Sequence, residues 1–200
     1  MYRNAVALIY SFGCLAGYCD ADELGFIRAE IRHGPGNVII SCQVKDTRWI
    51  IGQELSFVTQ VENHSESDVN VFDPFYDLMT KTSQHTTQLE ILDHKFRRIG
   101  DMFAWDGGAE VVLWPEFWHV LPNGALLQSR LCCYHAGYVP RTEFIKGHEL
   151  APGVYYLRLV IMGNFFWEDY KADSSNKKRI AESKPIRIEL ITPTPGLAPS

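Results

Sequence analysis

Apolar and polar residues alternate along two long segments of the chain. In residues 54–62 the apolar side chains Leu55, Phe57 and Val61 occupy alternate positions, and residues 154–162 repeat the pattern with Tyr155 and Leu157. Successive side chains of an extended strand point to opposite faces, so a period of two predicts strands with one buried face. Both segments are therefore predicted to be half-buried β-strands.

Shorter β-rich segments, bounded by turn residues, occur along the rest of the chain. We expect strands at residues 37–44, 69–71, 88–92, 110–113, 126–134 and 185–191. The best helix candidates, residues 73–82 and 166–181, lack a convincing apolar stripe. About seven short strands with turns between them predict an all-β, antiparallel sandwich. The strand–helix alternation that a parallel sheet requires is missing.

The two alternating segments predict a shared core between two antiparallel sheets. We expect this core to contain Leu55, Phe57, Val61, Tyr155, Leu157 and Leu159. Arg158 should then lie on the opposite, surface side of its strand, and its replacement by alanine should destabilise far less than that of Leu157. Pro152 and Gly153 can form a tight turn, beside which the Tyr155 hydroxyl can bond the backbone across the corner.

Three motifs resemble those of bacterial immunoglobulin-like domains. Gly-Gln-Glu-Leu-Ser-Phe at 52–57, followed by Val-Glu-Asn-His-Ser at 61–65, resembles their B strand and the turn after it. Leu-Pro-Asn-Gly at 121–124 resembles a turn before a late strand, and Leu-Ala-Pro-Gly-Val-Tyr-Tyr-Leu at 150–157 resembles the entry to the F strand. In its spacing the chain resembles the intracellular proteinase-inhibitor (BsuPI-like) and related extracytoplasmic sandwiches over residues 37–191. The resemblance implies an immunoglobulin-like antiparallel β-sandwich.

The beginning of the chain has the layout of an export signal. One positive charge in residues 1–4 precedes an uncharged, mostly apolar run at 5–17, and acidic residues follow. This order is typical of secretory signals, and the run is shorter than the ~20 apolar residues that span a bilayer. We expect residues 1–19 to be a signal peptide or a lipoprotein signal, with lipid attachment at Cys14 or Cys19 left open. The alternative is a buried N-terminal strand.

The rest of the chain is expected to form one domain. Residues 22–192 would hold the sandwich with an N-terminal extension at 26–32, and residues 193–200 a Pro-rich tail that cannot join a sheet. Export would place the domain outside the cytoplasm, where Cys42 could form one disulfide across the core with Cys132 or Cys133. Membrane contact would come only through an N-terminal lipid.

Composition excludes several classes of protein. The chain is 46% hydrophobic and 22% charged, as in ordinary globular proteins, so wholesale disorder is excluded. The net charge is −5 and the basic residues are scattered, so the basic stripe of a nucleic-acid-binding protein is missing. The short run Lys177-Lys178-Arg179 is interpreted as solvated loop charge.

Motifs for catalysis or metal binding do not stand out. The chain has no Gly-x-Ser-x-Gly elbow and no glycine-rich phosphate loop. Its histidines and cysteines lack the spacings that put two ligands on one face. Cys133 and His135 would share a strand face, but a core thiol beside a strand-end histidine is the favoured interpretation. We expect a non-enzymatic protein without a cofactor or a metal.

Two aromatic clusters, at residues 114–119 and 165–170, are the remaining candidates for function. The second cluster ends a predicted strand and leads into a polar loop at 171–183. Loops of sandwiches often bind, and Trp and Tyr are favoured interface anchors. The alternative is that both clusters cap the ends of the core. We expect a binding or structural module that contacts a protein partner through Phe165, Phe166, Trp167 and Tyr170.

A carbohydrate-binding module is the second hypothesis, because aromatic faces beside carboxylates can stack on sugar rings. Its candidate residues are Asp101, Trp105, Asp106, Trp114 and Glu116. The sequence Asp106-Gly107 is also a common turn signal, which is the alternative interpretation. A hydrolase with a non-local catalytic site is the third hypothesis, since triads assemble in space rather than in sequence.

Overall fold

The computed structural model describes residues 26–33, 36–72, 87–102, 118–139, 147–163, 165–172 and 178–193. Strands dominate these segments, and the helix among them is the short α2, Trp167–Ala172. The prediction of an all-β protein is confirmed. Among the described residues, no helix is long and apolar enough to cross a membrane. The predicted signal at residues 1–19 and residues 194–200 of the predicted tail lie outside the description.

Four antiparallel strands form the first sheet, in the order β1-β2-β4-β9. They are β1 (Phe26–His33), β2 (Gly36–Gln43), β4 (Glu54–Asn63) and β9 (Leu126–His135). The N-terminal extension is thus a strand, β1, which pairs with β2 along its whole length.

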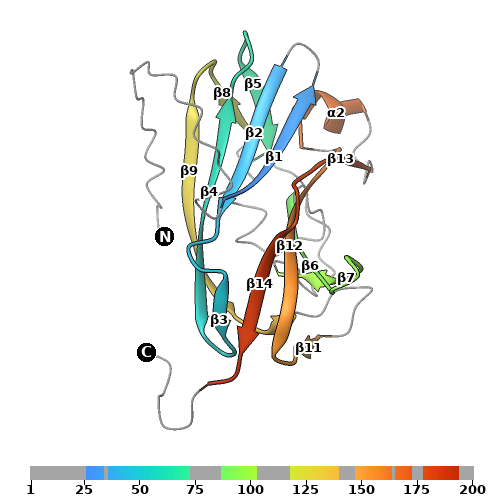
Figure 1. The fold of residues 1–200 in the computed structure, drawn as a ribbon. Coiled ribbons are helices and arrows are strands. Elements are labelled where there is room, and N and C mark those ends of the chain that lie inside the picture. Colours follow the sequence, from blue (N-terminus) through green and yellow to red (C-terminus); the bar gives the residue numbers. More distant parts are fainter. Residues whose placement is uncertain are drawn as a thin grey trace.

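A second, six-stranded sheet faces the first, in the order β3-β14-β12-β6-β7 with β13 beside β12 (Figure 1). Its strands are β3 (Arg48–Ile50), β6 (Thr87–Leu92), β7 (Arg98–Asp101), β12 (Gly153–Met162), β13 (Arg179–Glu182) and β14 (Ile186–Ile191). Neighbours are antiparallel except β3 and β14, which are parallel. After β2 the chain leaves the first sheet and enters the second as β3.

Two pairs of strands lie outside the large sheets. β5 (Val69–Phe72) pairs with β8 (Trp118–Leu121), and β10 (Tyr138–Val139) pairs with β11 (His148–Glu149). A single bridge between Val71 and Phe166 joins the start of the α2 segment to β5. Helix α2 therefore lies at the end of the molecule where β5 and β8 meet (Figure 1).

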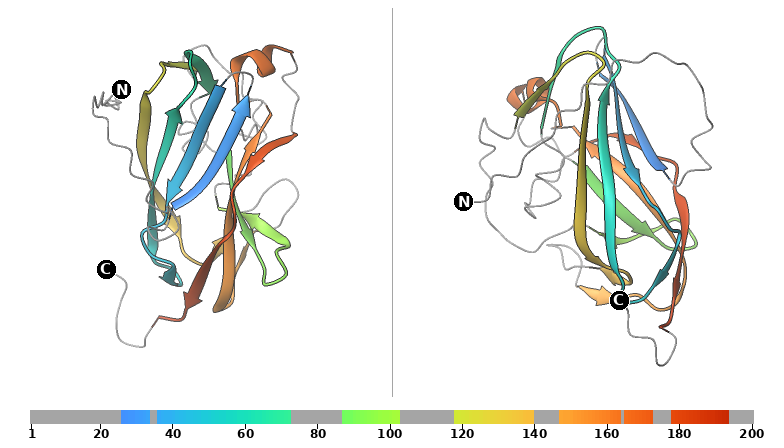
Figure 2. Two further views of the ribbon diagram at one scale, coloured as in Figure 1. Left: turned by 45° about the horizontal axis from the view of Figure 1, so that its top comes forward. Right: turned by 90° about the vertical axis from the view of Figure 1, so that its left-hand side faces the viewer.

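The core fills the space between the two layers of sheet, which Figure 2 shows from two sides. Leu55, Phe57, Val61, Leu157 and Leu159 are buried in it, and Tyr155 packs against it partly buried. The predicted core residues are confirmed, and with them the register of β4 and β12. Trp49 from β3 adds an edge-to-face contact with Phe57, with ring centroids 6.2 Å apart.

The strand predictions are confirmed wherever the structure describes them, while several short strands were missed. The predicted strand at 110–113 and the helix candidate at 73–82 lie outside the described residues. The expected polar loop at 171–183 is wrong, because it contains the end of α2 and the strand β13. β7 and β13 contain only four residues each and are rich in charge, so no alternation could reveal them.

A break between β13 and β14 is bridged by a side chain. Pro185 has no backbone N–H to donate to a ladder, and the strand stops around it. Just before it, the Ser183 backbone N–H donates to the Leu159 carbonyl at 2.9 Å. In return, the Leu159 N–H donates to the Ser183 hydroxyl at 2.9 Å. The hydroxyl thus takes the place of a carbonyl that the break removes.

The disulfide expected at Cys42 does not form, since its thiol is free and buried. β2 and β9 belong to the same sheet with β4 between them. Strands two places apart are separated by about 9–10 Å, beyond the ~4.4–6.8 Å between the Cα atoms of a disulfide. Neither Cys132 nor Cys133 can therefore reach Cys42. Burial raises the pKa of the Cys42 thiol to about 12, so the thiol is not a nucleophile.

The corner before β12 has the hydrogen bond expected from the sequence. The Tyr155 hydroxyl donates to the Ala151 carbonyl at 2.9 Å. Burial raises the pKa of this hydroxyl, which therefore stays a donor. The bond closes the turn and fixes where β12 begins.

The register of β12 can be tested by replacing Leu157, which is completely buried. Leu157→Ala should lower the free energy of unfolding by about 2–5 kcal/mol, because it leaves a cavity in the core. Val154→Ala, on the opposite face of the same strand, should cost less than about 1 kcal/mol. Chemical-denaturation midpoints measure both losses, and a larger loss for Val154 would contradict the register.

The Tyr155 corner can be tested with two neighbouring tyrosines. Tyr155→Phe removes only the hydroxyl and should cost about 0.5–1.5 kcal/mol of stability. Tyr156→Phe is the matched control, because the Tyr156 hydroxyl forms no hydrogen bond among the described residues. Thermal unfolding of the two variants is the measurement. Equal melting temperatures would show that the corner bond contributes nothing.

Candidate functional site

The first candidate site is a cluster of charged residues on the outer face of the second sheet. On β6 and β12, alternate residues such as Leu89 and Leu157 point into the core, so Glu90 and Arg158 point away from it. The two lie directly opposite each other across the strands. Glu90 is nevertheless completely buried. Val160, on the outer face of the neighbouring strand β12, is completely buried as well.

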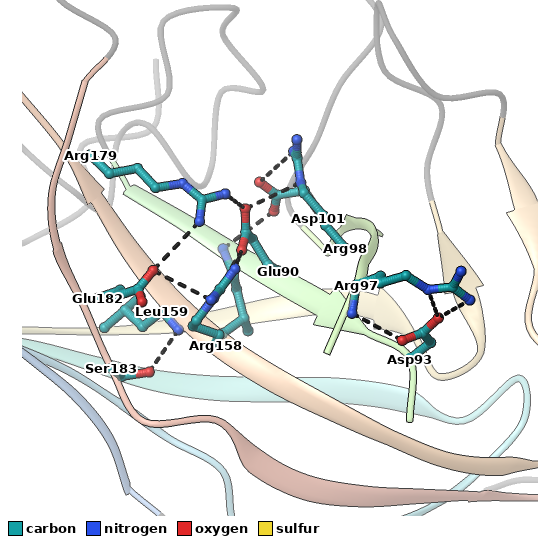
Figure 3. Close-up of polar contacts among 11 residues, drawn as sticks. Glu90, Asp93, Arg97, Arg98, Asp101, Arg158, Leu159, Arg179, Glu182 and Ser183 are labelled. Atoms are coloured by element: carbon teal, nitrogen blue, oxygen red, sulfur yellow. Dashed lines mark hydrogen bonds and ion pairs between the residues drawn. The ribbon is translucent and has the colours of Figure 1, made fainter. Parts of the chain in front are cut away.

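Three guanidinium groups bind the Glu90 carboxylate (Figure 3). Arg158 donates to Oε2 through Nε at 3.1 Å and through Nη2 at 2.7 Å. Arg98 approaches Oε1 with Nε at 3.3 Å, and Arg179 donates to the same oxygen through Nη2. Because both oxygens are engaged and have no exposed surface, Glu90 cannot reach a substrate as a general acid or base.

Two further carboxylates surround the three arginines. Glu182 Oε2 lies 3.4 Å from Nη1 of Arg158 and 3.5 Å from Nη1 of Arg179. Asp101 Oδ2 lies 4.0 Å from Nη2 of Arg98, while its Oδ1 accepts the Leu89 N–H at 3.3 Å. Three positive and three negative side chains therefore join β6, β7, β12 and β13. The arrangement binds strands together rather than offering a charged site to a ligand.

This cluster corrects two expectations about charge. Arg158 is on the face opposite the core, as expected, but its side chain is only 17% exposed and is paired with a buried carboxylate. Arg179, expected in a solvated loop, lies in β13 and binds Glu90. One signal was present in the sequence, since Glu90 is an acidic residue within the otherwise apolar end of β6. Its partners lie far away in the chain and could not be named.

The cluster predicts a large cost for Arg158→Ala, about 2–3 kcal/mol of unfolding free energy, because a buried carboxylate loses its two-pronged partner. Arg97→Ala is the matched control, since Arg97 also binds one carboxylate, Asp93, through Nε at 2.7 Å and Nη2 at 2.6 Å. Its side chain is 71% exposed, so its loss should matter far less. Urea denaturation compares the two variants. Similar losses would mean that Glu90 does not depend on Arg158.

The second candidate site is an aromatic pair at the end of the molecule beside α2. Trp118 of β8 and Trp167 of α2 meet edge to face, with ring centroids 4.9 Å apart. Each comes from one of the two aromatic clusters seen in the sequence, which the fold brings together. Both side chains are half-buried. The sequence could name the clusters but could not pair them.

Phe165 and Phe166, expected to contact a partner, are buried in the core and pack edge to face with centroids 5.2 Å apart. For these two residues the burial agrees with the alternative that the cluster caps an end of the core, and it leaves them no surface for a partner. The two rings close the end of the core beside β5, to which Phe166 is bridged through Val71. The backbone of Tyr170 belongs to α2, and its side chain lies outside the description. Of the three members whose side chains are described, Trp167 is the one that keeps accessible surface.

Around Trp167 an apolar surface is bordered by a lysine–glutamate pair. Val120 is 63% exposed and lies on the same face of β8 as Trp118, while Leu121 on the other face is buried. The Lys171 ammonium lies 5.5 Å from the Trp167 ring centroid and 2.8 Å from the Glu168 carboxylate. We call Trp118, Val120, Trp167 and Lys171 the tryptophan patch.

The candidate glycan residues are mostly beyond what the structure describes. Trp105, Asp106, Trp114 and Glu116 lie outside the described residues. Asp101 is buried and bound to Arg98 and to the backbone, so its carboxylate faces the protein rather than a sugar. Within the described part of the chain, no three potential ligands gather in a way that could hold a metal.

Comparison with known proteins does not assign the chain to a family. No family model matches the chain, and no curated protein matches it significantly. Among solved structures it is similar to the β-glucosidase from Listeria innocua, in complex with isofagomine and with glucose, at a TM-score of 0.39 and 11% identity. The similarity covers 78% of this chain and only 16% of the enzyme's chain. A similarity of this degree carries no argument about activity.

Proposed function

We propose that this chain is an exported, non-enzymatic binding module with an immunoglobulin-like sandwich fold. We further propose that it contacts a protein partner through the tryptophan patch. The observation that carries the proposal is the meeting of Trp118 and Trp167, two half-buried indoles from distant segments, beside the exposed Val120.

The strand order supports an immunoglobulin-like assignment. Immunoglobulin sandwiches place strands A, B and E in one sheet and strands C, F and G in the other. With β2, β4, β6, β9, β12 and β14 taken as A to G without D, the sheets contain A-B-E and G-F-C. The hydrogen bond from Tyr155 to Ala151 has the geometry of the tyrosine corner that such domains place near the start of F.

Export rests on the layout of residues 1–19, a charged start followed by a short apolar run and acidic residues. This layout is typical of secretory signals, with or without lipid attachment. Mass spectrometry of the mature N-terminus would identify cleavage and lipid together. A chain that keeps residue 1 in its native host would contradict export.

The composition of the tryptophan patch favours a protein as the ligand. Tryptophan is enriched among the residues that dominate interface energies. An exposed valine beside it extends the apolar surface, and the ion pair of Lys171 with Glu168 forms a polar rim. Glu90, at the centre of the charged cluster, is completely buried and bound by three arginines, so it offers no general acid or base, and we favour a binding role over catalysis.

The proposal predicts that Trp167→Ala lowers partner capture at least tenfold, the loss expected for an interface anchor. Tyr138→Ala is the control, since Tyr138 is a 50% exposed aromatic on β10, outside the patch. Chains with a photo-crosslinking residue at Val120 would be used as bait on envelope extract from the host. Circular dichroism would check the fold of each variant.

Three outcomes would contradict the proposal. Equal capture by Trp167→Ala and wild type would remove the patch as the site. Binding on a glycan array, with quenching of tryptophan fluorescence, would replace the protein partner by a carbohydrate. Turnover in an esterase or peptidase screen would make the chain a hydrolase.

A further inference from the structure

A strained residue stands at the tip of the β6–β7 hairpin. Phe96 has a φ of 58°, the left-handed conformation that bulky L-residues rarely adopt. Its side chain is 54% exposed, so burial of the ring in the core does not compensate for the strain. A strained residue that presents a large apolar side chain to solvent makes the hairpin tip a candidate binding surface.

Asp93 holds the hairpin in this conformation. Its Oδ1 accepts the backbone N–H of Lys95 at 2.8 Å and of Arg97 at 2.9 Å. The Phe96 N–H donates to the Asp93 carbonyl at 2.9 Å. The Arg97 backbone N–H, together with the Arg97 side chain and Lys95, lowers the pKa of Asp93 to about 2. The hairpin that carries Phe96 therefore has its carboxylate, Asp93, engaged by hydrogen bonds within the hairpin itself.

The Phe96 ring packs on Tyr156, with centroids 4.6 Å apart and planes tilted by 45°. Tyr156 lies between Leu92 and Arg187 in the strand register, on the outer face of the sheet. Val154, two residues earlier on β12, shares this face and is 37% exposed. Phe96, Tyr156 and Val154 thus form an apolar surface, here called the hairpin face.

Two basic side chains border the hairpin face. Arg187 is exposed and directly opposite Tyr156. Lys95, also exposed, lies at the hairpin tip. The half-buried Glu189, opposite Val154, lies on this face too. Among the described carboxylates of the face it is the one without an arginine partner. Because the whole chain carries a net charge of −5, a basic and aromatic face is the reverse of its average surface.

We propose that the hairpin face docks an acidic segment of a partner protein. The segment would place one apolar side chain against Phe96 and Tyr156 and its carboxylates beside Lys95 and Arg187. Charge complementarity selects this occupant, since opposite charges at a rim speed association and exclude basic partners. The face is separate from the tryptophan patch, because Figure 1 places α2 and β8 at one end and the β6–β7 hairpin toward the other. The proposal therefore stands without the proposed function.

A peptide library displayed on phage, selected against the whole chain, provides the probe. We expect the enriched peptides to carry several Asp or Glu residues around one apolar residue. Their affinity, measured by fluorescence anisotropy, should fall several-fold when salt is raised from about 50 to 500 mM. Enrichment of neutral or basic peptides would overturn the proposal.

Phe96→Gly separates binding from folding. Glycine adopts a φ of 58° without strain, so this variant should melt at or above the temperature of the wild-type chain. Affinity for the selected acidic peptide should nevertheless fall about tenfold. Unchanged affinity, or lost stability with affinity retained, would show that Phe96 has only a structural role and would overturn the proposal.

Arg187→Glu tests the charge independently of the ring. We expect it to weaken peptide binding several-fold at low salt and to have little effect at high salt. Lys178→Glu makes the same change of charge beside Gly163, past the end of β12 that is remote from Tyr156, and should leave affinity unchanged. Equal effects of the two reversals would mean that only net charge matters, which would also overturn the proposal.

Discussion

A carboxylate buried in a β-sheet must be accompanied by positive charge, because desolvation of an unpaired ion is far more costly than most contacts are favourable. Glu90 meets this requirement with arginines from three strands, β7, β12 and β13. The requirement constrains the second sheet, since a slip of β12 by one residue would turn Arg158 into the core and leave Glu90 without its main partner. It also explains why the four-residue β13 stays beside β12 although the break at Ser183 separates it from β14.

The same strand, β12, connects the core to the outer surfaces. Leu157 and Leu159 are buried between the sheets, while Tyr156 and Arg158 on the other face contact Phe96 and Glu90. The outer face is therefore divided along its length: one part is closed by ion pairs, and the next part is left open around Phe96. The ion pair of Arg158 with Glu90 holds β12 in place. The neighbouring Tyr156, which contacts Phe96, therefore lies on a strand of fixed position.

Features that depend on local interactions could be predicted from the sequence. Alternation predicted β4 and β12 with their buried faces, since the pleat alone determines which side chains share a face. The Pro152-Gly153 turn predicted the bond of Tyr155, which spans only four residues. The burial of Phe165 and Phe166 was one of two alternatives left open, because consecutive aromatics carry no signal that distinguishes a sealed core end from an exposed loop. The free thiol of Cys42 was not predicted, because strand order rather than spacing decides its possible partners.

The sequence by itself therefore determined the two long alternating strands, their core face and the corner at Tyr155, because period and turn chemistry act within a few residues. Only the tertiary structure decided which charges and rings meet. Glu90 and Arg158 are separated by 68 residues, and Trp118 and Trp167 come from different aromatic clusters. Such meetings depend on strand order and register, which the packing of the whole core selects and no short segment encodes.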